Sequence, residues 1–191
     1  MNDYESWLSR FLSHVTTDLY FYTTPDMETM VRQLRGDLPM VLNTSFATPF
    51  DIPPLQGREE AYKKMHALDR EKDYHNPELY AIWAAKPYLL AEAVRTSADS
   101  TPSHVKGYEY VFWTDAGAFR AKHAYRDWPG LDRVEEVWSQ GKKESGQNAD
   151  ELLFFPIQNL PHVSMLVWND QLGPIDNDFS EGELYVAVFF R

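Results

Sequence analysis

The first forty or so residues alternate between helical and strand-like patterns, and this alternation restricts the possible folds more than any other feature. Residues 3–15 carry large apolar side chains at spacings of three and four, the pattern of an amphipathic helix. An aromatic segment at 18–23 is typical of a strand, and a second helical pattern at 27–34 precedes another strand-like segment at 39–43. Because a helix then connects two strands within a short span, the sequence predicts a βαβ unit with parallel strands.

Further helical patterns follow this unit. The expected helices are residues 57–73, 79–98 and 131–139. The helix at 79–98 contains Pro87, so it either kinks there or consists of two helices that meet at Lys86. Loops are expected at residues 44–57, 99–103 and 141–147.

The clearest later strand is residues 108–114, which are apolar at nearly every position and are therefore expected to be buried on both faces. Other strand candidates are residues 152–155, 163–168 and 184–190. No repeat, low-complexity segment or linker divides the chain, so we expect one α/β domain over residues 1–191.

Composition excludes several classes of protein. The chain has 43% hydrophobic and 15% aromatic residues, too many for a disordered protein. It has no cysteine, which excludes disulfides, thiol nucleophiles and cysteine-bound metals. The net charge of −11 argues against a general nucleic-acid binder, which needs a basic face.

The sequence also predicts no membrane span. The longest stretch without charge, residues 152–169, contains Pro156, Pro161 and several polar residues, so two strands and a bend explain it better than a spanning helix. Acidic residues near Met1 do not fit a signal peptide, and a cytoplasmic location is the default expectation.

Asp115 is the strongest single candidate for a functional residue. It follows the buried strand at 108–114, and Gly117 next to it allows a sharp turn of the backbone. In open α/β sheets, ligands bind at the carboxyl ends of strands, and a carboxylate there can hold a divalent cation shared with substrate phosphates. The alternative is that Asp115 only caps the following turn.

A cluster of basic residues follows Asp115 in this acidic chain. Residues 116–126 include Arg120, Lys122, His123 and Arg126 and contain no acidic residue. A cation on one side and basic donors on the other would suit a diphosphate. The alternative is an ordinary solvated loop that pairs with Asp127 and Asp132.

Lys86 is unusual because it lies in an otherwise apolar helical segment. Its side chain either reaches solvent along its stem or points into a polar cleft towards an anion. The sequence lacks the usual entry motifs of zinc proteases, α/β-hydrolases, P-loop NTPases and dinucleotide-binding proteins.

Two motifs resemble the HtrL/YibB-like family. They are the segment IWAAKP at 82–87 and the segment FWTDAG at 112–117, which match an "IW..KP" helix followed by a strand ending in W-hydrophobic-D-A-G. Members of this family look like glycosyltransferases of the GT-A type. The resemblance therefore implies a three-layer, Rossmann-like α/β domain with a mostly parallel central sheet.

The resemblance also implies roles for individual residues. Asp115 would take the place of the acidic motif that binds metal and diphosphate, with Mn²⁺ or Mg²⁺ as cofactor. Trp83 and Lys86 would belong to the helix that lines the same cleft. Gly117, Arg120 and Lys122 are added as binding residues because of their charge or proximity to Asp115.

The sequence departs from the family pattern in three places. It begins at the helix with Tyr4 and Trp7 where the family has a preceding strand, and it stops soon after Gly182, so we expect a shortened relative or a partial gene product. Gly117 stands where the usual motif has its second carboxylate, which leaves metal dependence open.

Three functional hypotheses follow. The first is a glycosyltransferase-like protein that binds a nucleotide-diphosphate sugar and an unknown acceptor. The second is an inactive module that keeps the fold and self-associates through the apolar C-terminal strand at 184–190. The third is a metal-assisted phosphohydrolase centred on Asp115.

Overall fold

The computed structural model describes residues 3–69, 72–100, 108–152, 154, 189 and 190. These residues fall into two compact units. The first unit contains the described residues up to Ala47, those from Tyr108 to Phe154, and Phe189 with Phe190. The second contains Thr48 to Ser100.

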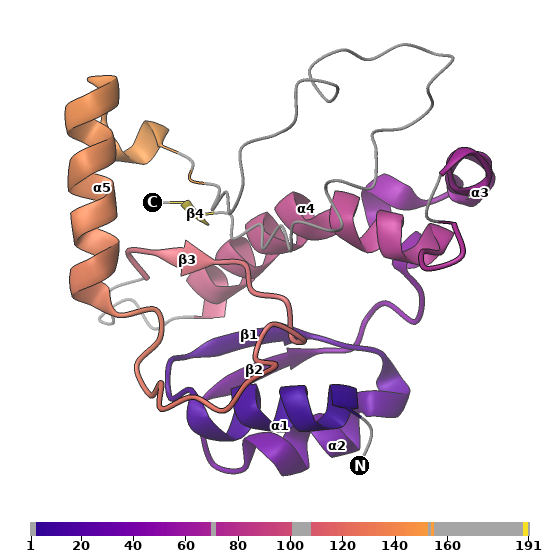
Figure 1. Cartoon of the computed structure of the whole chain (residues 1–191), viewed down its shortest axis with the longest axis horizontal. Coiled ribbons are helices and arrows are strands. Elements are labelled where there is room, and N and C mark those ends of the chain that lie inside the picture. Colours follow the sequence, from indigo (N-terminus) through magenta and orange to yellow (C-terminus); the bar gives the residue numbers. More distant parts are fainter. Residues whose placement is uncertain (1–2, 70–71, 101–107, 153, 155–188, 191) are drawn as a thin grey trace. The chain divides into compact units, whose positions relative to one another are not determined.

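The predicted βαβ unit is present at the start of the first unit. Helix α1 (Asp3–His14) precedes strand β1 (Leu19–Tyr22), and helix α2 (Glu28–Arg35) leads to strand β2 (Met40–Asn43). The two strands pair in parallel from Leu19 opposite Met40 to Tyr22 opposite Asn43. Both α1 and α2 lie on one face of this small sheet (Figure 1).

Local sequence explains where α2 begins and ends. A short 3₁₀ turn, η1 (Pro25–Met27), precedes the helix, and its first residue is a proline whose missing N–H costs nothing there. The helix ends at Gly36, which has a φ of 60° and accepts a conformation that other residues resist.

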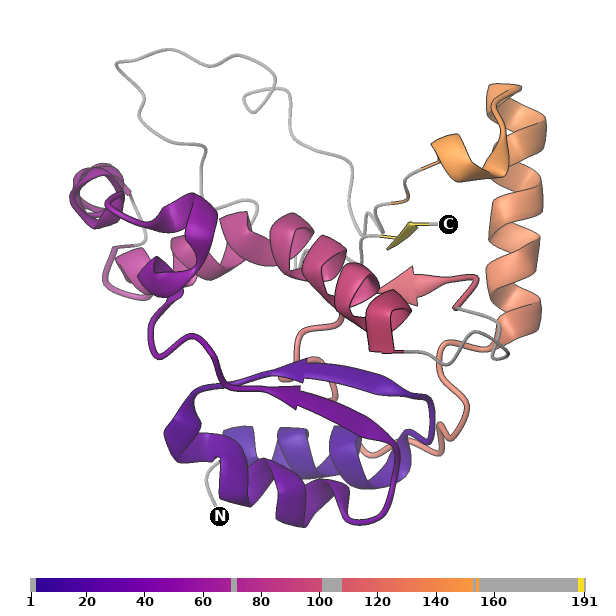
Figure 2. The same cartoon turned by 180° about the vertical axis from the view of Figure 1, so that it is seen from behind.

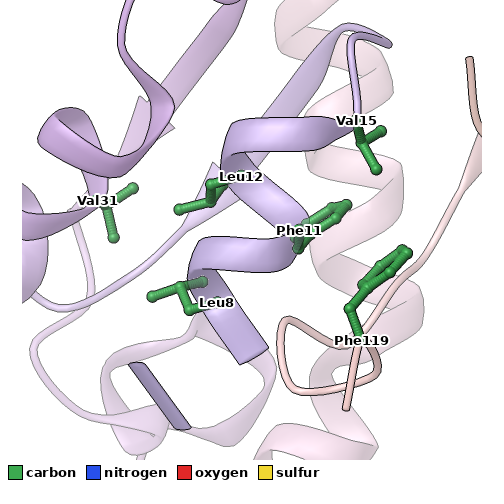
Figure 3. Close-up of a cluster of buried hydrophobic side chains, with 6 residues drawn as sticks. All are labelled: Leu8, Phe11, Leu12, Val15, Val31 and Phe119. Carbon is green, nitrogen blue, oxygen red and sulfur yellow. The ribbon is translucent and has the colours of Figure 1, made fainter. Parts of the chain in front are cut away.

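The core of the first unit lies between these helices and the sheet. Its buried members are Leu8, Phe11, Leu12, Val15, Val31 and Phe119. Figure 3 shows Leu8 and Leu12 turned towards Val31, while Phe11 lies against Phe119. The last two rings stack with centroids 4.7 Å apart, so the loop after β3 completes a core that α1 begins.

Arg35 joins the elements of the βαβ unit although it is only 2% exposed. Its guanidinium donates to the backbone oxygens of Leu12, Val15, Thr17 and Pro39. These oxygens belong to the end of α1 and to the segments that lead into β1 and β2, so one side chain fixes their relative positions. Burial lowers the pKa of Arg35, and the carboxylate of Asp18 partly offsets this effect.

The remainder of the first unit is built on a second small sheet and a long helix. Strand β3 (Val111–Phe112) pairs antiparallel with β4 (Phe189–Phe190). Helix α5 (Leu131–Ser145) lies beside this sheet (Figure 2). A second core forms there around three buried residues, and the whole cluster consists of Tyr110, Phe112, Val134, Trp138, Ala149, Leu152 and Phe154.

Two sequence predictions are wrong in this region. The strand expected at 108–114 is reduced to the two half-buried residues of β3, which pair with Phe189 and Phe190 among the residues that the structure describes. The loop expected at 141–147 is largely helix, since α5 continues through Gly141 to Ser145 and ends at Gly146, where φ is 70°. Phe154 covers Gly141, so the glycine that suggested a loop provides room for a ring.

The described part of the second unit, within residues 48–100, consists of helices and their connections. Two 3₁₀ turns, η2 (Pro49–Asp51) and η3 (Pro53–Leu55), precede helix α3 (Glu59–Leu68) and the long helix α4 (Pro77–Ser100). Both turns contact α4. The buried apolar residues of this unit are Ile52, Leu55, Ala81, Ala85, Leu89, Leu90 and Ala93.

Helix α4 distinguishes the two alternatives for Pro87, a kinked helix or two helices that meet at Lys86. The proline lies inside a single continuous helix, and two helices do not meet at Lys86. The helix also reaches Ser100, two residues into the segment expected to be a loop.

The α/β character predicted from the sequence is confirmed, but the three-layer arrangement is not. The described residues form two separate two-stranded sheets, one parallel and one antiparallel, and do not make a full three-layer, Rossmann-like domain. The strand expected at 163–168, and most of that expected at 184–190, lie outside the described residues.

Candidate functional site around Asp115

Asp115 lies in a tight turn three residues after β3. Its backbone oxygen accepts a hydrogen bond from Ala118 N at 3.0 Å, which closes the turn over Ala116 and Gly117. The carboxylate is half-buried, and its Oδ1 accepts a hydrogen bond from Trp113 Nε1 at 2.7 Å. The strand end therefore holds the carboxylate in a defined orientation.

The N-terminal turns of α1 form the surroundings of this carboxylate. Partial burial and, to a smaller extent, the negative charge of Asp115 raise the pKa of Tyr4. A Cβ atom added to Gly117 would lie 3.4 Å from Tyr4 Cε2 and 3.7 Å from Trp7 Cε3. The backbone at Gly117 thus passes directly over two aromatic rings of α1.

Arg120 adds a positive charge to the same place. Its guanidinium carbon Cζ lies 5.0 Å from the centroid of the Trp7 ring, within the range of a cation–π interaction. Arg10 Nη1 donates a hydrogen bond to the backbone oxygen of Arg120, which fastens the loop to α1. The side chain of Arg120 is exposed, so the aromatic ring orients a charge that ligands can reach.

The histidine of this loop has a structural role. His123 Nε2 lies 3.1 Å from the backbone oxygen of Arg10 and must donate to it, while Nδ1 accepts from Tyr125 N at 3.2 Å. Its ring also packs against Phe119 with centroids 4.8 Å apart. Both nitrogens therefore hold the loop in place.

The predicted site residues divide between the two units. Asp115, Gly117 and Arg120 come together against α1, and Lys122 is exposed on the same loop. Trp83 and Lys86 belong to α4 in the second unit.

In α4, the two predicted residues differ in exposure. Trp83 is 42% exposed, whereas Lys86 is only 5% exposed. The stem of Lys86 therefore does not carry its ammonium group out to solvent, which was one of the two alternatives for this residue.

Sequence analysis missed Tyr4, Trp7 and Arg10 as members of the site. The helical pattern assigned Trp7 to the packed face of an amphipathic helix, and no local signal connects it with a loop 113 positions later. A basic residue and two aromatic residues on successive turns of one helix are the only hint that the sequence contains.

The carboxylate donor set of the site is small. Among the residues that the structure describes, no group of three or more histidine or acidic side chains could enclose a metal ion. Mg²⁺ is often held by one or two carboxylates together with substrate phosphates and water, so Asp115 alone fits such a shared cation but not a site made wholly by protein.

A shallow pocket lies elsewhere in the first unit, with a volume of about 280 Å³. It is lined by Glu109, Tyr110, Glu135, Trp138, Ser139 and Lys142. None of the residues around Asp115 lines this pocket, so it is separate from the candidate site.

Comparison with family models, with curated proteins and with solved structures finds no match for this chain. In the described part of the chain, no helix is both long enough and apolar enough to cross a membrane.

Proposed function

We propose that this chain is a glycosyltransferase-like protein that binds a nucleotide-diphosphate sugar at the site around Asp115. The observation that carries the proposal is the meeting of a carboxylate, a guanidinium and aromatic rings where the loop of residues 113–120 crosses α1. A carboxylate can bind the hydroxyls of a sugar, a guanidinium can bind phosphates, and aromatic rings can stack on a flat ring. The resemblance of residues 82–87 and 112–117 to the HtrL/YibB-like pattern supports the same function.

In this proposal, Arg120 binds the diphosphate. A guanidinium presents two parallel N–H groups that match phosphate oxygens, and its position over Trp7 reduces the freedom it loses on binding. Lys122 supplies a second positive charge from the same exposed loop. Together they stabilise the negative charge that collects on the leaving diphosphate as the glycosidic bond breaks.

Asp115 is the residue that would hold a divalent cation. Mg²⁺ or Mn²⁺, when bound with the substrate, neutralises charge on the diphosphate. Gly117 leaves the backbone close to Tyr4 and Trp7, and Arg120 lies over the second of these rings.

Thermal unfolding in the presence of nucleotides tests this proposal. UDP, GDP and ADP are added separately, each with and without Mn²⁺, and the melting temperature is measured. A ligand that binds only the folded state stabilises it by about 2.7 kcal/mol at a hundred times its Kd, so binding raises the melting temperature. We expect at least one nucleoside diphosphate to do so.

Variants show whether the effect arises at this site. Asp115→Ala and Arg120→Ala should abolish most of the shift. The matched control is Arg133→Ala, because Arg133 is exposed on α5 and pairs with Glu136 of the same helix at 2.5 Å. No shift with any nucleotide, or an unchanged shift in Asp115→Ala, would contradict the proposal.

The same samples separate the other two hypotheses. Release of nucleoside diphosphate from a sugar nucleotide supports a transferase, whereas release of inorganic phosphate supports a phosphohydrolase. Nucleotide binding without turnover supports a binding or assembly module.

A further inference from the structure

The second unit contains a polar network between α3 and α4. His75 Nδ1 lies 2.8 Å from Asp69 Oδ2, and the Tyr80 hydroxyl donates to the same carboxylate oxygen. The side chains of His75 and Asp69 are only 13% and 12% exposed. One carboxylate thus fixes the orientation of both rings.

His66 fixes the connecting segment from the other side. Its Nε2 lies 3.0 Å from the backbone oxygens of Lys72 and of His75, and because both oxygens only accept, Nε2 carries the proton. The ring of His66 also lies beside Tyr80, with centroids 6.2 Å apart. The positions of His75 and Tyr80 are therefore determined by several contacts.

Trp83 packs against these two fixed rings. Its centroid lies 5.5 Å from that of His75 at an interplanar angle of 78°, and 5.7 Å from that of Tyr80 at 65°. Both contacts are edge-on, the arrangement that aromatic pairs prefer. Trp83 nevertheless remains 42% exposed.

An aromatic ring that is held firmly and left partly in solvent offers apolar surface whose burial is favourable. A ligand that covers the indole gains this burial without first ordering the ring. Small-molecule sites commonly combine such an apolar surface with a few placed polar groups. Here the Tyr80 hydroxyl and His75 Nδ1 are held by the carboxylate of Asp69 beside the ring.

We propose that Trp83, with His75 and Tyr80, forms a platform that binds a neutral saccharide. The C–H face of a pyranose ring packs against the electron-rich indole, and its hydroxyls stay hydrated around the edge of the platform. The carboxylate of Asp69 disfavours a phosphorylated ligand at this place. This binding goes beyond the function proposed for Asp115 and does not depend on it.

The experiment uses the full chain without nucleotide. Maltose, cellobiose, lactose and N,N′-diacetylchitobiose are titrated at millimolar concentrations while the indole N–H signals of the six tryptophans are followed by NMR. We expect one of the disaccharides to shift the signal of Trp83, assigned from Trp83→Phe. The signal of Trp138 should stay unchanged, since its Nε1 is buried and donates to the Ala149 oxygen.

Three variants test the role of the ring. Binding to the variants is measured by calorimetry, because those at position 83 lack the indole signal. Trp83→Ala should weaken binding by about tenfold or more, and Trp83→Phe, which keeps an aromatic face, by about threefold. Val94→Ala is the matched control, because it shortens a similarly exposed apolar residue of the same helix, and it should bind like the unchanged chain. Circular dichroism verifies that each variant is folded.

The inference is overturned if no disaccharide shifts the Trp83 signal, if Trp83→Ala binds as well as the unchanged chain, or if uridine or adenosine shifts this signal instead. These outcomes are independent of nucleotide binding at Asp115. If no disaccharide binds at Trp83 but a nucleotide raises the melting temperature, the platform alone is rejected. If a disaccharide binds at Trp83 but no nucleotide raises the melting temperature, the proposed function is rejected and the platform stands.

Discussion

Arg35 Nη1 donates a hydrogen bond of 2.5 Å to the backbone oxygen of Val15, a residue that is completely buried just after α1. The same nitrogen donates to the oxygen of Leu12 at 3.1 Å. A positive charge at the C-terminal end of a helix also interacts favourably with the helix dipole. The link between α1 and α2 is therefore polar as well as hydrophobic.

We predict that Arg35→Met lowers the free energy of unfolding by about 3 kcal/mol, because it leaves several buried backbone oxygens without a donor. Urea unfolding followed by circular dichroism measures this loss. Arg32→Met is the matched control, since Arg32 is exposed on the same helix and pairs with Glu28 at 2.8 Å. This variant should lose less than about 0.5 kcal/mol, and equal losses in both would refute the role of Arg35.

Much of this unit could be predicted from the sequence, because the spacing of apolar residues at 3–15 and 27–34 is a local property of the chain. The strand predicted at 108–114 is too long for a physical reason. Aromatic and β-branched residues favour a strand, but the length of a strand depends on a distant partner, and in the described part of the chain Phe189 and Phe190 pair with Val111 and Phe112 alone. Gly141 suggested a loop where the chain is helical, because the role of this glycine depends on its contact with the distant Phe154.

The candidate site could also be predicted only in part from the sequence. Asp115 and Arg120 could be selected from their position and charge alone. Their partners Tyr4 and Trp7 could not, because the contacts between α1 and the loop exist only after the chain has folded.

The contact between Arg120 and Trp7 leads to a second prediction. Replacing Trp7 with alanine removes the ring that orients the guanidinium, and a cation–π interaction at an exposed site contributes about 0.5–1 kcal/mol. We expect the affinity for the nucleoside diphosphate to fall about threefold to fivefold in Trp7→Ala, measured by calorimetry. Trp7→Phe should restore part of it, and an unchanged affinity in Trp7→Ala would show that Arg120 does not need this ring.

Tyr108 makes stability depend on pH in the alkaline range. Its hydroxyl donates to Asp18 Oδ2 at 2.7 Å, and this hydrogen bond, with some burial and the carboxylate charge, raises its pKa from 10.0 to about 12. Between these pH values the unfolded chain has lost the phenolic proton while the folded chain still keeps it. The stabilisation is therefore complete below pH 10 and is lost as the pH rises towards 12.

Because Tyr108 is exposed, we expect this contribution to be below about 1 kcal/mol. Spectrophotometric titration of the tyrosines, with unfolding measured at several alkaline pH values, tests it. Tyr108→Phe should remove the late-titrating phenol, and Asp18→Asn should return the pKa of Tyr108 towards its ordinary value. A titration curve that Asp18→Asn leaves unchanged would speak against the hydrogen bond.

The effect of Gly141→Ala on stability depends on the neighbouring ring of Phe154. A Cβ atom at this position would lie 2.5 Å from Phe154 Cζ and 2.8 Å from Cε1, so Gly141→Ala must displace the ring. We expect it to destabilise the chain by about 1 kcal/mol, although alanine favours a helix by about the same amount. In a Phe154→Ala background the same substitution should stabilise, and thermal unfolding of the four proteins in this cycle measures the difference.

The first unit is assembled from three separate stretches of sequence, and residues 48–100, which belong to the other unit, lie between the first two of them. Phe11 stacks on Phe119, a residue that the ribosome adds 108 positions later. At about 5–20 residues per second, α1 is therefore complete for roughly 5–20 seconds before the loop that covers it exists. During synthesis its apolar face depends on α2 and the β1–β2 pair for cover, while residues 48–100 can fold before the first unit is closed.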